Sequence, residues 1–274
     1  MAKTVKALVI AGNGTNCERE VAVACRLAGS ACDIVHIAEL LTGRTRLDDY
    51  HFLNLAGGFL DGDDLGSAKA GANRLKEASV RDTTDSLADQ LQRFIADGKL
   101  VMGVCNGFQL MTKMGLLPAL DGDYTTQTVT LTHNDSGRFE DRWTYLAIDP
   151  ESPCIYTRGL EETLYLPVRH GEGKFYTDKS TLDAIQARHL APLAYADASG
   201  EPTTAYPSNP NGSISAVAGL CDASGRLFGL MPHPEAYLHR THHPRWTREP
   251  GLPEEGMGLW LYRNAVDFIR QELL

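Results

Sequence analysis

Short apolar runs alternate with amphipathic segments along the first 105 residues, and this alternation restricts the fold more than any other feature of the sequence. The apolar runs have the length and composition of buried strands. They cover residues 5–11, 32–37, 52–56 and 100–104. Strands that alternate with helices predict an α/β fold with a mostly parallel central sheet, helices on both faces, and a ligand site beyond the carboxyl ends of the strands.

Helix-end signals lie between these runs. Residues 15–18, Thr-Asn-Cys-Glu, match a capping box, which predicts a helix that begins there and ends at Gly29. A second helix is expected over about residues 84–97, with Gly98 closing it. The Gly-, Ala- and Asp-rich stretch at residues 61–72 predicts a long functional loop.

The second half of the chain has a different pattern. Residues 125–132 and 142–148 are rich in β-branched and aromatic side chains, which predicts an antiparallel extension of the sheet. A further strand is expected at residues 227–231, and an amphipathic helix at residues 259–274. Because no repeat or linker interrupts the sequence, we expect one domain over residues 1–274.

Charge and cysteine usage narrow the classes of partner. Lys and Arg number 26 against 35 Asp and Glu, a net charge of −9, which argues against nucleic acid as a partner. The apolar run at residues 5–11 is too short to span a membrane and lacks a signal-type cleavage site, so a cytoplasmic location is expected. The six cysteines form no C-x-x-C pair and are expected to be reduced thiols.

Cys105 has the sequence context of a nucleophile. Residues 103–107, Gly-Val-Cys-Asn-Gly, follow a predicted strand and open a predicted helix, as in a nucleophile elbow, on the same rim as Gly12 and Gly57. The helix N-terminus favours the reactive thiolate. The alternative is a buried structural cysteine after a strand. The other cysteines are interpreted as packing residues: Cys17, Cys25, Cys32, Cys154 and Cys221.

A cysteine that attacks an amide needs a base and a group that orients the base. His233 and Glu235 follow the predicted strand at residues 227–231, and the two flanking prolines are expected to keep the backbone extended, so that alternate side chains share a direction. A lone H-x-E is more often an unrelated loop pair. Its combination with Cys105 favours the catalytic interpretation.

Two other groups of residues give weaker signals of a functional site. Residues 12–14, Gly-Asn-Gly, resemble the start of a dinucleotide fingerprint with Glu39 as a ribose ligand, but Cys17 occupies the place of the third glycine. His239, His242 and His243 include the donor type of a zinc site, yet no predicted helix positions them, and a solvated loop is expected.

Together, residues 103–109 and 231–235 resemble the two signatures of class I, or triad, glutamine amidotransferases. Further segments resemble the glutaminase part of phosphoribosylformylglycinamidine synthase: residues 54–59, 134–139, 167–173 and 206–213. The sequence departs from that pattern at residues 60–63, Leu-Asp-Gly-Asp, where Ser-Tyr-Gly-Asp is usual, and at Asp141, where a cysteine is common. The resemblance implies a flavodoxin-like fold.

The resemblance also implies a mechanism. Cys105 would attack the carboxamide of glutamine, His233 would protonate the departing ammonia and then activate water, and Glu235 would fix the imidazole tautomer. The backbone N–H groups of Gly58 and Asn106 would form the oxyanion hole. By analogy with the family, the glutamine-binding residues would be Gln109, Gly171 and Glu172.

The implied product, ammonia, would pass to a separate synthetase subunit that makes formylglycinamidine ribonucleotide with ATP and magnesium, in a complex that also has a small accessory subunit. No cofactor or metal is expected in this chain. Two other functions stay open. One is another cysteine-elbow hydrolase of a related fold, and the other is a non-catalytic scaffold subunit of a synthetase complex.

Overall fold

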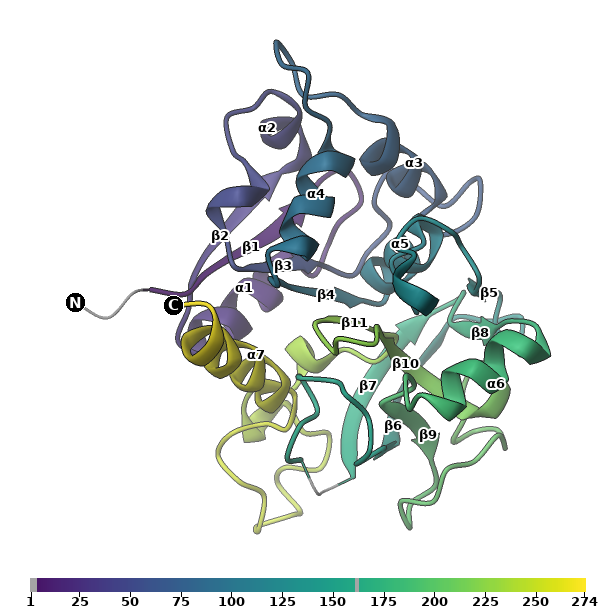
Figure 1. Ribbon diagram of the computed structural model, residues 1–274. Coiled ribbons are helices and arrows are strands. Elements are labelled where there is room, and N and C mark those ends of the chain that lie inside the picture. Colours follow the sequence, from purple (N-terminus) through teal and green to yellow (C-terminus); the bar gives the residue numbers. More distant parts are fainter. Residues whose placement is uncertain (1–3, 161–162) are drawn as a thin grey trace.

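The computed structural model describes residues 4–160 and 163–274. Its centre is a nine-stranded sheet with the strand order β2-β1-β3-β4-β11-β10-β9-β6-β7 (Figure 1). The parallel part consists of β2 (Ala31–His36), β1 (Lys6–Ala11), β3 (Phe52–Leu55), β4 (Leu100–Val104) and β11 (Leu227–Leu230). The antiparallel part consists of β10 (Val217–Cys221), β9 (Leu193–Ala196), β6 (Glu140–Ile148) and β7 (Leu164–His170). The predicted α/β sheet with an antiparallel extension is confirmed.

Helices cover both faces of the parallel part (Figure 1). On one face α1 (Glu18–Leu27) packs with α7 (Gly258–Glu272). On the other face lie α3 (Lys69–Glu77), α4 (Leu87–Ala96) and α5 (Asn106–Met114). The remaining helical segments are α2 (Ile37–Leu41), α6 (Lys179–Ala187) and the 3₁₀ turns η1 (Leu47–Asp49), η2 (Leu120–Gly122), η3 (Ile214–Ala216), η4 (Pro234–Ala236) and η5 (Arg240–His242). None of the described helices has both the length and the apolar character needed to cross a membrane.

The predicted strand at residues 125–132 is largely wrong. Only Thr130–Thr132 forms a strand, β5, and it pairs with β8 (Lys174–Tyr176) in a separate two-stranded sheet. The preceding residues form a turn instead, because the Asp123 carboxylate accepts the N–H groups of Thr125 and Thr126 at 2.8 and 3.2 Å. Local side-chain to backbone bonds of this kind compete with strand pairing.

The predicted helix ends are partly correct. Gly29 and Gly98 follow α1 and α4 with φ of +96° and +76°, as expected of glycines that end helices. The predicted capping box of α1 is absent, because Thr15 Oγ1 accepts the N–H of Gly12 at 3.1 Å rather than one in the helix. A capping box is present at the start of α4, between Ser86 and Asp89. α3 also occupies the end of the predicted loop at residues 61–72.

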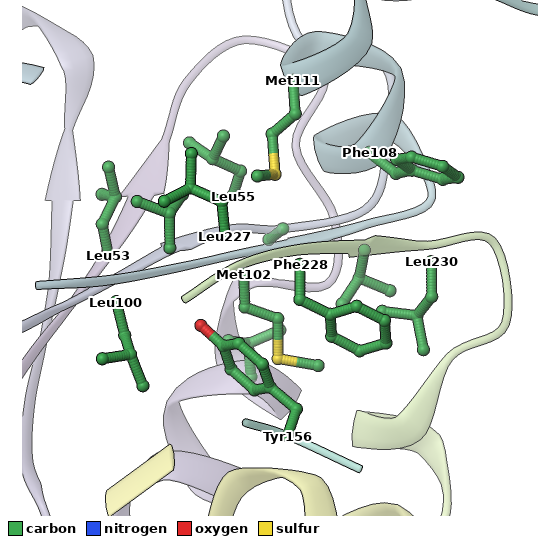
Figure 2. Close-up of a cluster of buried hydrophobic side chains, with 14 of the residues drawn as sticks. Leu53, Leu55, Leu100, Met102, Phe108, Met111, Tyr156, Leu227, Phe228 and Leu230 are labelled. Atoms are coloured by element: carbon green, nitrogen blue, oxygen red, sulfur yellow. The ribbon is translucent and has the colours of Figure 1, made fainter. Parts of the chain in front are cut away.

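The core lies on both sides of the parallel strands (Figure 2). Phe108 and Met111 of α5 cover one face of the sheet, and Tyr156 packs against the other, with its ring centroid 5.1 Å from that of Phe228. α5 approaches β3 closely at Gly107, where a Cβ would lie 1.9 Å from the carbonyl oxygen of Leu55. Only glycine therefore permits this distance between helix and strand.

Gly107→Ala is expected to lower the free energy of unfolding by about 2 kcal/mol or more, because the added methyl group would force α5 away from β3. Chemical denaturation monitored by circular dichroism measures this. Gly251→Ala is the matched control, since a Cβ there meets nothing within 4 Å. Equal stability of both variants would show that α5 can move without cost.

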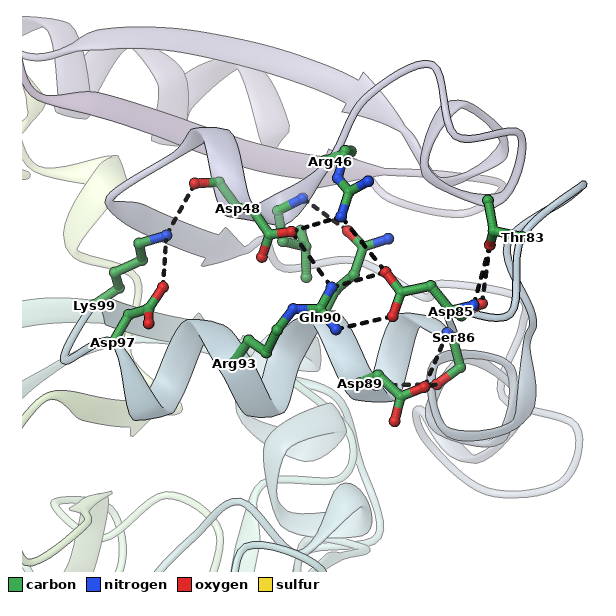
Figure 3. Close-up of polar contacts among 11 residues, drawn as sticks. Arg46, Asp48, Thr83, Asp85, Ser86, Asp89, Gln90, Arg93, Asp97 and Lys99 are labelled. Atoms are coloured by element: carbon green, nitrogen blue, oxygen red, sulfur yellow. Dashed lines mark hydrogen bonds and ion pairs between the residues drawn. The ribbon is translucent and has the colours of Figure 1, made fainter.

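Ion pairs join α4 to the segment before β3 and to the residues just before α4 itself (Figure 3). The Arg93 guanidinium lies 2.7 Å from the carboxylate of Asp85 and 3.3 Å from that of Asp48. Beneath them, the buried side-chain oxygen of Gln90 accepts the Leu47 N–H at 3.0 Å. The hydrogen bond from Arg93 lowers the pKa of Asp85, so this carboxylate stays ionised to a lower pH than an ordinary aspartate does.

Candidate active site

Cys105 occupies the sharp turn between β4 and α5. Its φ of +52° and ψ of −106° are uncommon for a residue that has a side chain. Its N–H donates to the Leu230 carbonyl at 2.8 Å, and its own carbonyl accepts the Gln109 N–H at 3.0 Å. Such backbone strain costs about 1–3 kcal/mol and persists where the surrounding structure fixes it. The predicted strand-turn-helix elbow is therefore present.

His233 and Glu235 form a buried hydrogen-bonded pair just beyond β11. His233 Nδ1 lies 2.6 Å from Glu235 Oε1, and each residue is 2% exposed. Burial alone would lower the pKa of His233, but the Glu235 carboxylate and the thiols of Cys105 and Cys17 outweigh it and raise that pKa well above its usual value. Within the described part of the chain His233 Nε2 has no hydrogen-bond partner, so this nitrogen is available for proton transfer.

The two prolines predicted an extended backbone at this pair, and that prediction is wrong. Residues Pro234–Ala236 form the turn η4, in which the N–H groups of Ala236 and Tyr237 donate to the carbonyls of His233 and Pro234 at 3.2 and 3.0 Å. The turn brings the Glu235 carboxylate back to the imidazole, so the predicted pair forms through a different backbone geometry.

Gly57 shows how close the elbow and the histidine lie. A Cβ on Gly57 would be 2.9 Å from His233 Cε1 and 3.6 Å from Cys105 Cβ, so both side chains share the space that glycine leaves empty. The Cys105 thiol points toward the carbonyl of Arg169 at 3.7 Å. The structure thus brings together the predicted nucleophile and base from the ends of two neighbouring strands, β4 and β11.

A pocket of about 120 Å³ opens onto these groups. Its wall includes the predicted residues Cys105, His233, Gly58, Gln109, Gly171 and Glu172. The half-exposed rings of Phe59 and Phe139 also line it. A pocket with a few convergent polar groups and a strongly perturbed histidine is the usual form of an active site.

Of the two residues predicted to form an oxyanion hole, Gly58 lines the pocket and Asn106 follows Cys105 directly in the chain. Gly58, with φ of +132°, stands opposite Thr15 in an antiparallel bridge whose hydrogen bonds are made by the neighbouring residues. In such a non-hydrogen-bonded pair the N–H points away from the partner strand. Asn106 is the first residue of α5, where N–H groups lack partners within the helix. Both positions suit the binding of developing negative charge.

Hydrogen bonds hold each of the predicted glutamine-binding segments in place. Gln109 Nε2 donates to the Glu172 carbonyl at 2.6 Å, and Gln109 Oε1 accepts from Asn106 Nδ2 at 3.2 Å. The Gly171 carbonyl accepts the Asn134 N–H at 2.9 Å. Gln109 therefore fixes the backbone at Glu172 relative to the elbow helix as well as lining the pocket.

Cys17 and His170 also line the pocket, although neither was predicted there. Cys17 was expected to be a packing residue, but its Sγ lies 3.9 Å from His233 Nδ1. Burial and the charge of His233 lower the pKa of His170 to about 3, so its ring is neutral. His170 Nδ1 lies 3.2 Å from Asn134 Oδ1. The only sequence signal for His170 was its place in residues 167–173, one of the segments that carry the family resemblance.

The dinucleotide alternative is excluded by packing at the first strand end. A Cβ on Gly12 would lie 2.5 Å from Leu60 Cδ1, and one on Gly14 would lie 2.0 Å from the Phe59 carbonyl oxygen. The N–H groups of Asn16 and Cys17 before α1 donate to the Gly57 carbonyl. These contacts fill the turn that a glycine-rich phosphate-binding loop would need to leave open.

The histidines at 239–243 do not converge on a common point. His239 Nε2 lies 2.7 Å from Glu254, and His242 Nδ1 accepts the Leu238 N–H at 3.2 Å. His243 is only 4% exposed and packs against Trp143 with ring centroids 5.8 Å apart, so the expected solvated loop is wrong at this residue.

One group of potential metal ligands occurs among the described residues. It consists of Cys17, His233 and Glu235, whose ligand atoms lie within 4.8 Å of one another. The short contact between His233 and Glu235 leaves no space for an ion between them, which fits a hydrogen-bonded catalytic pair better than a metal centre.

Comparison with known proteins agrees with this geometry. Residues 4–269 match the family model of the CobB/CobQ-like glutamine amidotransferase domain. Phosphoribosylformylglycinamidine synthase subunit PurQ of Dehalococcoides mccartyi is 43% identical, over 97% of this chain and 98% of that protein. The subunit of the same name from Methanococcus maripaludis is 38% identical over the same shares.

Among solved structures, a chain of PurLQS from Thermotoga maritima matches with a TM-score of 0.69 and 25% identity, over 97% of this chain and 100% of that one. The family match and the two relatives extend along nearly the whole described chain. The chain therefore belongs to the CobB/CobQ-like glutamine amidotransferase family and, within it, to the family of phosphoribosylformylglycinamidine synthase PurQ subunits.

Proposed function

We propose that this chain is the glutaminase subunit of a phosphoribosylformylglycinamidine synthase and hydrolyses glutamine to glutamate and ammonia. The observation that carries the proposal is the convergence of the strained Cys105 elbow with the buried pair of His233 and Glu235 in one pocket. Membership in the family supports the same reaction.

In the proposed mechanism the Cys105 sulfur attacks the side-chain carboxamide of glutamine. His233 holds a proton because Glu235 stabilises the imidazolium, and it delivers this proton to the departing ammonia. The neutral imidazole then takes a proton from the water that hydrolyses the thioester. Glu235 keeps the ring in one orientation through both steps.

Charge on the carbonyl oxygen is received by the N–H groups of Gly58 and Asn106. Fixed backbone donors of this kind need no rearrangement during the reaction, and each contributes about 3 kcal/mol to transition-state stabilisation. We further propose that the pocket wall formed by Gln109, Gly171 and Glu172 receives the amino-acid head of glutamine.

We propose that the ammonia passes to a synthetase subunit, with a small accessory subunit in the same complex, and is used to make formylglycinamidine ribonucleotide. ATP and magnesium would act in the synthetase, and the chemistry of this chain is proposed to need neither cofactor nor metal. The same proposal includes a cytoplasmic location. The six free cysteines support this location, because thiols stay reduced in a reducing compartment.

The test is to supply glutamine to the complex of this chain with its synthetase and to follow glutamate by an enzyme-coupled assay. Glutamate formed in step with the amidine product supports the proposal. Cleavage of peptides without release of glutamate from glutamine would favour the related cysteine hydrolase. Absence of both activities would favour a scaffold subunit.

The segment after Gly58 is proposed to gate this activity. In the structure it is fastened to the site at two points: the Leu60 N–H donates to Asn106 Oδ1 at 3.1 Å, and the Ser67 N–H donates to Glu172 Oε2 at 3.2 Å. The glycines at 62 and 66 have positive φ, which gives the intervening chain freedom to rearrange. A movement here would reach both the oxyanion hole and the substrate-binding wall.

Glutaminase turnover is therefore expected to rise by about 5- to 150-fold when the synthetase and its nucleotide substrate are both present, which corresponds to the usual coupling free energy between two sites of about 1–3 kcal/mol. Steady-state rates with the chain alone, with the synthetase, and with both measure this. Equal rates under all three conditions would refute gating and leave the triad mechanism unaffected.

A further inference from the structure

A second thiol, that of Cys17, lies beside the proposed catalytic groups. Its Sγ is 3.9 Å from His233 Nδ1 and donates to Asn16 Oδ1 at 3.0 Å. Cys17 is 8% exposed and lines the same pocket as Cys105. The mechanism proposed above gives this thiol no task.

The two cysteines and the imidazole of His233, whose Cε1 would lie 2.9 Å from a Cβ on Gly57, surround the side-chain position that this glycine leaves empty. A Cβ there would lie 3.3 Å from Cys17 Sγ and 3.6 Å from Cys105 Cβ. Because Gly57 has no side chain, nothing from this residue separates the two cysteines. A disulfide requires Cβ atoms about 3.8 Å apart. Side-chain rotation moves only the two sulfur atoms, so any difference from this distance is made up by a shift of the backbone at Cys17, the residue just before α1.

We propose that Cys17 is a resolving thiol for Cys105, so that oxidation of the nucleophile by a hydroperoxide ends in a reversible Cys17–Cys105 disulfide. Glutamine hydrolysis stops while the disulfide persists and resumes when a dithiol reduces it. The inference rests on the proposed function in taking Cys105 as the reactive thiol.

The Cys105 thiolate attacks the peroxide O–O bond, and with one proton it becomes a sulfenic acid while the peroxide is reduced to an alcohol or water. The Cys17 sulfur then attacks the sulfenic sulfur, the S–S bond forms, and the hydroxyl leaves as water with the proton of Cys17. His233, next to both sulfurs, can relay this proton.

Burial raises the pKa of Cys17, which keeps this thiol protonated and slow to react with peroxide itself. Once His233 has given its proton to the peroxide oxygen, the neutral imidazole is the base that takes the proton of Cys17 in the resolving step. The other described cysteines are buried outside the wall of this pocket: Cys25, Cys32, Cys154 and Cys221. They offer matched controls for loss of a thiol.

The test exposes the full chain, in complex with its synthetase, to hydrogen peroxide and then to dithiothreitol. Trypsin releases Cys17 as the only cysteine of residues 7–19 and Cys105 as the only cysteine of residues 100–113, so mass spectrometry identifies their disulfide directly. The wild type is expected to show this linked pair and to regain most of its initial glutaminase activity. Cys32→Ser is expected to behave in the same way.

After dithiothreitol, the fraction of initial activity that Cys17→Ser regains is expected to be at least about five-fold smaller than the fraction that the wild type regains. The variant is also expected to accumulate sulfinic acid at Cys105, which dithiothreitol does not reduce. If this variant fails to fold, the peptide map of the wild type still decides. Absence of the linked peptides after oxidation, or equal recovery by Cys17→Ser and wild type, would overturn the proposal. Absence of glutaminase activity before any peroxide is added would instead contradict the proposed function.

Discussion

Replacing Cys105 by alanine is expected to lower kcat for glutamine hydrolysis by about 10⁴-fold or more, because no other group can form the covalent intermediate. The neighbouring thiol of Cys17 does not substitute for it. Its pKa is raised by burial, and it lies at the N-terminal end of α1 rather than on the elbow. Glutamate release under saturating glutamine measures the effect.

The fold is expected to tolerate this change. Alanine removes only the sulfur atom, while the backbone bonds of Cys105 to Leu230 and Gln109 remain. Unfolding curves of variant and wild type should therefore nearly coincide. Synthesis with added ammonia in place of glutamine should also continue in the reconstituted complex. Glutamate release at the wild-type rate would exclude Cys105 as the nucleophile.

The parallel half of the sheet and the elbow could be predicted because both depend on local patterns. Four short, mainly apolar runs and the glycines around Cys105 determine strand, turn and helix within a few residues of themselves. The pairing of His233 with Glu235 was also predicted, since two residues of separation keep the side chains close in either backbone form. The 3₁₀ turn that produces the contact was not predicted, because proline tolerates both.

Cys17 was misinterpreted because its environment is made by distant segments. Its N–H is bonded to the Gly57 carbonyl, and its thiol faces His233, more than 200 positions along the chain. Nothing near Cys17 in sequence carries that information. The same holds for His243, whose burial depends on packing with Trp143 of β6. Sequence patterns predict elements well, whereas contacts between elements need the tertiary structure.

Replacing His233 by alanine is expected to reduce kcat nearly as much as the loss of Cys105. The imidazole is needed both to protonate ammonia and to activate water, and its Nε2 has no competing partner among the described residues. Because nucleophile and base act as a unit, the double variant should be little slower than either single variant. A loss in the double variant equal to the product of the two single effects would show that Cys105 and His233 act independently.

Glu235→Gln separates the role of charge from that of position. The amide can keep a hydrogen bond to the ring, but it removes the negative charge that raises the pKa of His233, so that pKa should fall. We expect a loss of kcat about 10²-fold smaller than that of His233→Ala. The alkaline limb of the kcat/KM profile, which follows loss of the His233 proton, should move to lower pH. An unshifted alkaline limb would mean that Glu235 orients the imidazole without stabilising its charged form.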